Sequence, residues 1–227
     1  MSPSFYLAVA FLGLTLWLGR AQWQAAVKRR TARAAYFDAV AGLFDRVVTQ
    51  VQPSGFTRMT GHLDNLAFDI QAVPDSLTFR KLPALWGMVT LAEPLPVRAT
   101  LDVMARPTGN EPFSHFATLP QSLPCPAFLP EGTAIRCDNV TLVDMDLLHS
   151  LAGIFDNVRV KELVVSPKGL RLVILAEEAD RGRYLLFRDA EMGATPLSPE
   201  LLQDLMDGLC EVWAEFQAMS AAKLVAE

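Results

Sequence analysis

The sequence predicts an α+β protein: an N-terminal transmembrane helix followed by an amphipathic helix, then an antiparallel sheet domain with a closing C-terminal helix. Three observations support this fold class. Residues 5–19 form an uncharged apolar run, residues 56–187 alternate repeatedly between apolar and polar residues, and residues 201–219 repeat apolar residues at helical spacing. Alternation with a period of two is typical of strands, and predicted helices do not separate successive strands, which favours an antiparallel sheet over a parallel one.

Residues 1–30 are predicted to form a membrane anchor and a basic collar. The apolar run from Phe5 to Gly19 has only fifteen residues, whereas a helix needs about 20 to cross the hydrocarbon core of a bilayer. The helix can extend through residues 21–27, because Arg20 can direct its charge toward the headgroups. The residues predicted to contact the membrane and its interface are Phe5, Tyr6, Trp17, Arg20, Trp23, Lys28, Arg29, Arg30 and Arg33.

The charges after the apolar run predict its orientation. Residues 1–19 contain no Lys or Arg, and residues 20–33 contain five. The positive-inside rule therefore predicts a single-pass protein of a bacterial-type inner membrane, with the N-terminus outside and the C-terminal domain in the cytoplasm. Two alternatives remain open: a cleaved export signal, which would have basic residues before the run, and a buried core helix, which is seldom apolar on every face.

Residues 31–52 are predicted to form the amphipathic helix. Its apolar residues recur at steps of three and four, and Pro53, Ser54 and Gly55 end it. The helix could continue directly from the anchor as one rod. Its apolar stripe could pack on the domain, or it could associate with a second copy through a parallel coiled contact.

Residues 53–227 are predicted to form the α+β cytoplasmic domain. Residues 56–62 and 66–73 form a hairpin about Asp64 and Asn65, and further strands are expected at 77–81, 85–91 and 97–104. Residues 106–138 contain six prolines and lack periodicity, which predicts an ordered irregular segment on the sheet. A short helix is expected at 145–155.

The C-terminal part of the domain gives the clearest β pattern. Residues 158–165, 170–177 and 183–189 are predicted to form a three-stranded meander, with a tight turn at 166–169. Ser198 at the N-cap and Pro199 at the first helical position then open the final helix. Its apolar stripe is typical of a helix that covers a sheet.

Composition limits the compartment and the partners. Cys125, Cys137 and Cys210 are an odd number of cysteines without metal-ligand spacing, which fits free thiols in a reducing cytoplasm. Residues 1–52 hold six Lys/Arg and two Asp/Glu, whereas the remaining residues hold fourteen and twenty-three. A domain this acidic is a poor binder of nucleic acid, so the expected partners are the lipid bilayer and a membrane protein.

No local motif predicts catalysis, and the sequence predicts no cofactor and no metal site. His62, His115 and His149 are far apart, and no cysteine has a base beside it in sequence. The densest charged group, Glu177, Glu178 and Asp180, is expected at a solvated hairpin tip. Candidate catalytic residues in an enzyme assembled from distant positions would be His115 and Cys125.

Three hypotheses for function follow. The first is a non-enzymatic scaffold or accessory subunit of a membrane protein complex, which binds its partner or itself through the amphipathic helices. The second is a domain that binds an apolar or lipid-like ligand between the sheet and residues 201–219, with Phe113 and Phe116 as a lid. The third is an uncharacterised enzyme that uses His115 or Cys125.

Overall fold

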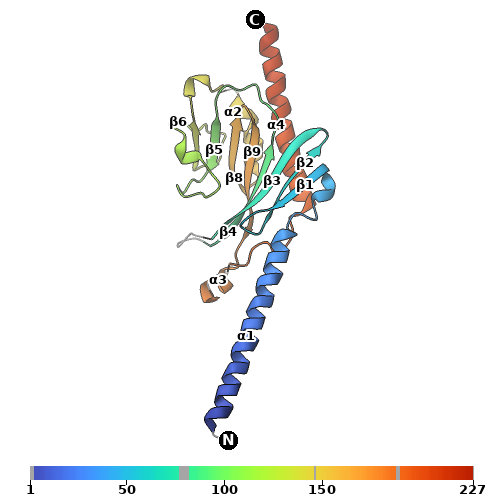
Figure 1. Ribbon diagram of the computed structural model, residues 1–227. Coiled ribbons are helices and arrows are strands. Elements are labelled where there is room, and N and C mark those ends of the chain that lie inside the picture. Colours follow the sequence, from blue (N-terminus) through green and yellow to red (C-terminus); the bar gives the residue numbers. More distant parts are fainter. Residues whose placement is uncertain (1–2, 77–81, 146, 188–189, 227) are drawn as a thin grey trace.

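The computed structural model confirms the α+β fold class: an N-terminal apolar helix, a nine-stranded antiparallel sheet and a C-terminal helix (Figure 1). It describes residues 3–76, 82–145, 147–187 and 190–226. The helices are α1 (Pro3–Ala34), α2 (Leu147–Ser150), α3 (Arg181–Phe187) and α4 (Pro199–Ala226), and the 3₁₀ turns are η1 (Ala41–Leu43), η2 (Phe116–Thr118), η3 (Val140–Leu142) and η4 (Ala152–Asp156). The strands are β1 (Asp45–Val51), β2 (Thr57–Leu63), β3 (Leu66–Asp75), β4 (Ala84–Leu91), β5 (Leu101–Ala105), β6 (Gln121–Leu123), β7 (Thr133–Cys137), β8 (Val160–Ser166) and β9 (Gly169–Glu178).

The sheet has two groups of strands, and the hairpin formed by the last two strands of the chain joins them. Its order is β1-β2-β3-β4-β9-β8-β5-β7-β6. The first four strands follow one another as a meander, and the β8–β9 hairpin inserts between β4 and β5. The two predicted hairpin turns are confirmed: Asp64 and Asn65 have φ of 51° and 67°, and Ser166 pairs with Gly169. A Cβ on Gly169 would lie 2.1 Å from the carbonyl oxygen of Leu91, so this turn requires glycine.

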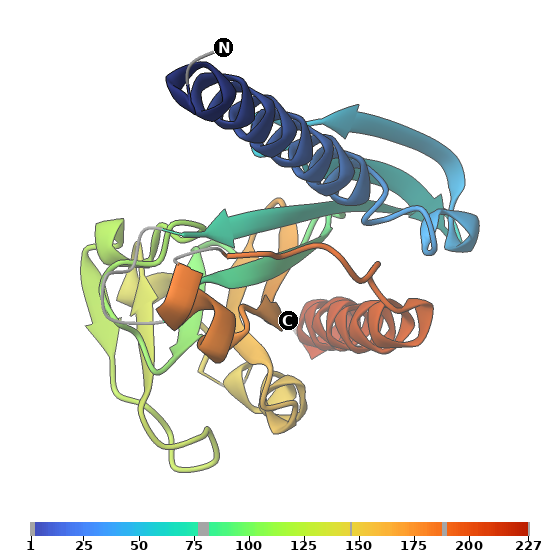
Figure 2. The ribbon, with the colours of Figure 1, turned by 90° about the horizontal axis from the view of Figure 1, so that it is seen from below.

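One face of the sheet, which we call the helix face, carries the main hydrophobic core. Helix α4 contacts β4, β9 and α2. Its buried residues Leu202, Leu209 and Phe216 belong to the same core as strand residues such as Val89 and Leu172. The predicted N-cap is confirmed, because the Ser198 hydroxyl accepts a hydrogen bond from the Leu201 amide at 3.3 Å. Seen from below, α1 and α4 lie on different sides of the sheet domain (Figure 2).

The opposite face, which we call the open face, has a smaller apolar cluster. Met88, Met104 and Val173 pack there with Phe113, and Phe113 lies 4.9 Å from Trp86 between ring centroids. Phe113 and Phe116 come from the proline-rich segment, which wraps on the sheet as expected. The segment is nevertheless not wholly irregular, because β6 and β7 form its second half and pair antiparallel. Their three and five residues are too few to give a clear period among the prolines.

The predicted amphipathic helix over residues 31–52 is wrong. Helix α1 ends at Ala34, a series of turns and η1 follow, and Asp45–Val51 is strand β1 paired with β2. Tyr36, Phe37 and Val40 are buried in the core, which requires the chain to turn back onto the sheet. Val47, Val48 and Val51 favour strand because β-branched side chains fit a pleated surface. There is accordingly no continuous rod from residue 4 to 51.

The predicted third strand of the meander is also wrong. Residues 181–187 form helix α3, because both edges of β9 are already paired, one with β4 and the other with β8. The strand expected at 97–104 begins only at Leu101. The short helix expected at 145–155 is present as α2 and η4. The strand expected at 77–81 lies outside the described residues.

Candidate functional site

Helix α1 extends away from the sheet domain with its apolar side chains exposed (Figure 1). Within the part of the chain that the structure describes, it is the one helix long and apolar enough to cross a membrane. Its 32 residues span roughly 48 Å at 1.5 Å per residue. Trp17 and Trp23 are each 64% exposed, and Phe5, Tyr6, Arg20, Lys28 and Arg30 are also exposed. A signal sequence near an N-terminus has the same length and composition.

Two of the predicted membrane-contacting residues, Arg29 and Arg33, contact the domain. The guanidinium of Arg29 lies 3.9 Å from the Glu191 carboxylate. The guanidinium of Arg33 lies 5.4 Å from the centre of the Phe56 ring and donates a hydrogen bond to the Ser54 carbonyl at 3.4 Å. Arg29 and Arg33 therefore hold the end of α1 against the domain, and Arg20, Lys28 and Arg30 are exposed.

A polar row crosses the open face of the sheet. Asp102 of β5 pairs with Arg136 of β7 on one side and with Val164 of β8 on the other. The row continues from Val164 to Arg171 of β9 and then to Thr90 of β4. Asp102 is 2% exposed, and Glu162, on the adjacent row of β8, is completely buried. Ser114 donates a hydrogen bond to Glu162, and Arg171 lies 3.9 Å from it. Two carboxyl groups and an arginine thus share one buried site.

The pKa values of both carboxyl groups are raised. Burial is the largest cause and the neighbouring Glu162 the next, and together they raise the pKa of Asp102 to about 8 against the opposing effect of Arg171. Burial also raises the pKa of Glu162, but the Ser114 hydroxyl and Arg171 stabilise its charged form. Two adjacent carboxylates in a low-dielectric site cannot both ionise at neutral pH. Asp102 is accordingly the protonated member, and Glu162 carries the charge that Arg171 balances.

A pocket of about 330 Å³ opens beside this acid pair. Asp102, Arg171 and His115 line it together with Gln71, Thr90 and Lys168. His115 comes from the proline-rich segment, and its side chain is exposed. The pocket combines an imidazole, a carboxylic acid and a guanidinium, which are groups that can transfer protons or bind a small polar ligand.

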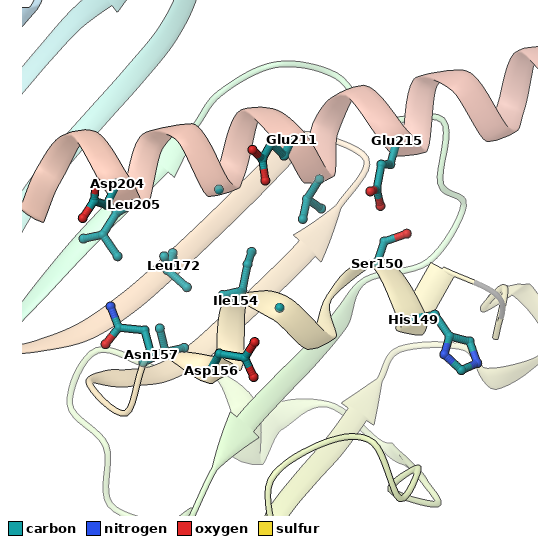
Figure 3. A pocket seen from close by; sticks show the side chains of 14 residues that line it. His149, Ser150, Ile154, Asp156, Asn157, Leu172, Asp204, Leu205, Glu211 and Glu215 are labelled. Atoms are coloured by element: carbon teal, nitrogen blue, oxygen red, sulfur yellow. The ribbon is translucent and has the colours of Figure 1, made fainter.

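A larger groove of about 590 Å³ lies between α4 and η4 (Figure 3). Asp204, Glu211 and Glu215 lie along α4, and Asp156 lies on the facing η4 segment. Apolar residues form its floor: Ile154, Val160, Leu172, Leu205 and Val212. A cavity between the sheet and residues 201–219 was expected, but its rim is acidic. The expected lid is wrong, because Phe113 and Phe116 pack on the open face.

The remaining candidate residues lie apart from one another. His62 is on β2, and His149 stacks on Phe128 with ring centroids 4.2 Å apart. Burial raises the pKa of all three thiols, Cys125, Cys137 and Cys210, which is the opposite of what a nucleophile needs. Glu177 and Glu178 end β9 instead of forming a hairpin tip, and Glu177 accepts a hydrogen bond from the Gly193 amide at 2.7 Å.

Sequence patterns did not identify Asp102, Glu162 and Arg171 as candidate site residues. Each is a charged residue inside an apolar strand, and this pattern alone was the available signal. Among the residues that the structure describes, no group of three or more His, Cys, Asp or Glu is placed to hold a metal ion. No family model matches the chain, and no curated protein matches it in sequence.

We predict that Asp102 makes stability fall as pH rises. Its pKa is 3.8 without the fold and about 8 within it, so between these values the folded chain retains a proton that the unfolded chain has lost. The contribution of Asp102 to the free energy of unfolding is therefore largest below pH 4 and is lost as the pH rises to about 8. Asp102→Asn keeps a neutral side chain, so its melting temperature should fall less between pH 5 and 8.

The measurement is thermal unfolding of both proteins across this pH range in one detergent. Glu131→Gln, at an exposed carboxyl, is the control and should keep the pH dependence of the unaltered chain. Arg136, Glu162, Arg171 and His115 face or adjoin the same site and are present in every variant. An equal pH dependence for Asp102→Asn and the unaltered chain would show that Asp102 is ionised in the folded state.

Proposed function

We propose that the chain is a single-pass membrane protein whose acidic α+β domain lies in the cytoplasm of a bacterial-type inner membrane, as a scaffold or accessory subunit of another membrane protein. The observation that carries this proposal is α1, an apolar helix with its surface exposed along its length. Exposed leucines and aromatics on such a helix are stable in lipid and unstable in water. The basic flank at residues 20–33 supports the orientation.

The charge of the domain supports the kind of partner. Cytoplasmic loops of membrane proteins carry an excess of Lys and Arg. The domain carries fourteen Lys/Arg against twenty-three Asp/Glu beyond residue 52, and the groove between α4 and η4 has an acidic rim and an apolar floor. A basic amphipathic segment of a membrane protein matches both features. The anchor keeps the groove close to such segments.

The first prediction concerns α1. Leu12→Arg with Leu16→Arg should move the protein from the membrane fraction to the soluble fraction after alkaline extraction, because each arginine at the centre of a bilayer costs about 2.5–3.5 kcal/mol. Val158→Arg, which replaces an equally apolar exposed residue on the domain, should leave the protein in the membrane.

Topology and processing are measured on the same protein. A reporter fused to the C-terminus should be active only in its cytoplasmic form, and the intact mass should include residues 3–34. A mass without these residues would identify a cleaved export signal, and an exported reporter would reverse the orientation. Either result would overturn the proposal.

The second prediction concerns the partner. Purification of the full chain in mild detergent should return a membrane protein in stoichiometric amount. Glu211→Gln with Glu215→Gln should reduce its recovery several-fold, because the acidic rim attracts basic segments through charges that the substitutions remove. Asp38→Asn with Glu131→Gln removes the same number of exposed charges elsewhere and should have no such effect. Repeated recovery of a lone monomer would contradict the accessory role.

The open-face pocket favours a second candidate function, an uncharacterised enzyme or binding protein for a small polar molecule. His115 lies in one pocket with Asp102 and Arg171, the arrangement that an enzyme assembled from distant residues would need. Mass spectrometry of the full chain under native and denaturing conditions should then detect a retained small molecule. Arg171→Met should abolish its retention, and Arg98→Met, at an exposed arginine outside this pocket, should preserve it. Detection of no small molecule in the unaltered chain would remove this candidate.

A further inference from the structure

Helix α3 has an outer surface that is apolar and has no cover in the domain. Leu185 is 58% exposed and Leu186 is 78% exposed, side by side in a helix of seven residues. Single exposed leucines are ordinary on a soluble surface, but two adjacent ones on a projecting helix form a small apolar tip. Arg181, at the start of the helix, is also exposed.

The chain on both sides of α3 is fixed to the domain. Before the helix, the Ala179 amide donates to the Pro83 carbonyl at 2.9 Å. After it, the Gly193 amide donates to the Glu177 carboxylate at 2.7 Å. Gly193 has φ of 80°, and a Cβ there would lie 2.5 Å from the Phe56 ring, so this segment fits closely against the domain. The position of α3 is accordingly set by its flanks.

The segment that follows α3 contacts the basic end of α1. Glu191 lies 3.9 Å from the guanidinium of Arg29, and residues 191, 192 and 194 line one cavity with α1 residues 25, 28, 29 and 32. Figures 1 and 2 both show α3 projecting from the end of the sheet domain at which α1 leaves it. When α1 spans a bilayer, this end faces the lipid headgroups.

We propose that α3 is a second membrane contact, in which Leu185 and Leu186 enter the headgroup region of the same bilayer that α1 crosses. The inference rests on the proposed membrane insertion of α1. A lipid surface is the occupant because the apolar tip projects from the end of the domain at which α1 leaves it, so a bilayer crossed by α1 would face this tip (Figure 1). Leucine side chains at this depth replace water contacts with acyl chains, and an adjacent arginine favours anionic headgroups. Two attachment points would fix the orientation of the sheet relative to the bilayer.

The test measures the depth of single side chains in the full protein. Cys125 and Cys210 are replaced by serine and alanine, and the completely buried Cys137 is kept. A nitroxide label is then attached to Leu186→Cys, to Trp23→Cys in α1, or to Met145→Cys, which is 43% exposed and precedes α2 at the far end of the sheet. Each protein is reconstituted in vesicles of phosphatidylcholine and phosphatidylglycerol. Collisions with lipid-soluble oxygen and with a water-soluble nickel complex are compared.

The label at position 186 should collide more with oxygen and less with the nickel complex than the label at position 145. The label at position 23 should differ from position 145 in the same way. If position 186 resembles position 145 while position 23 lies in lipid, the second contact is wrong and the anchor stands. If position 23 is also accessible to the nickel complex, the proposed membrane insertion itself fails. If the label at position 186 collides with neither reagent, protein covers α3 in place of lipid, and the inference is wrong.

Discussion

The aromatic junction after α1 is the contact on which the arrangement of the molecule depends. The Tyr36 ring lies 5.1 Å from the Phe37 ring and 5.5 Å from the Phe56 ring, and all three residues are at most 2% exposed. Edge-to-face pairs of this kind contribute about 0.5–1.5 kcal/mol beyond their burial. The Tyr36 carbonyl also accepts a hydrogen bond from the Leu197 amide at 3.0 Å, just before α4. One buried residue therefore connects the anchor, the first hairpin and the covering helix.

The strand order gives the two faces of the sheet different properties. Because β8 and β9 enter between β4 and β5, the last hairpin lies in the middle of the sheet. Their alternate residues join the core of the helix face, as Leu163 and Leu172 do, and carry Glu162 and Arg171 on the other face. The helix face is thus a continuous apolar core. The open face keeps charge within the sheet, where each buried carboxyl group needs a hydrogen bond or a counter-ion.

Local patterns in the sequence were sufficient for much of the fold, and tertiary contacts decided the rest. The α+β class, the hairpin at Asp64 and the N-cap at Ser198 follow from short-range rules, and all are present. Residues 31–52 have helical spacing, but burial of Tyr36 and pairing of β1 with β2 override it. Asp102 and Glu162 come close because the β5–β8 register pairs Asp102 with Val164 and Met104 with Glu162. No local pattern contains that information.

The distribution of charge is compatible with the proposed position of the acidic domain close to a membrane. Beyond residue 52 acidic residues outnumber basic ones, so an anionic leaflet repels the domain as a whole. At physiological salt this repulsion is screened within about 8 Å, so it acts mainly on the groups nearest to the headgroups. Those groups are the exposed Lys28 and Arg30 of the collar, with Arg181, Leu185 and Leu186 of α3. The acidic groove along α4 shares no lining residue with the cavity beside α1. In the proposed arrangement, basic and apolar groups at the end of the domain near α1 would allow close approach to the bilayer, and the acidic groove would be available to a protein partner.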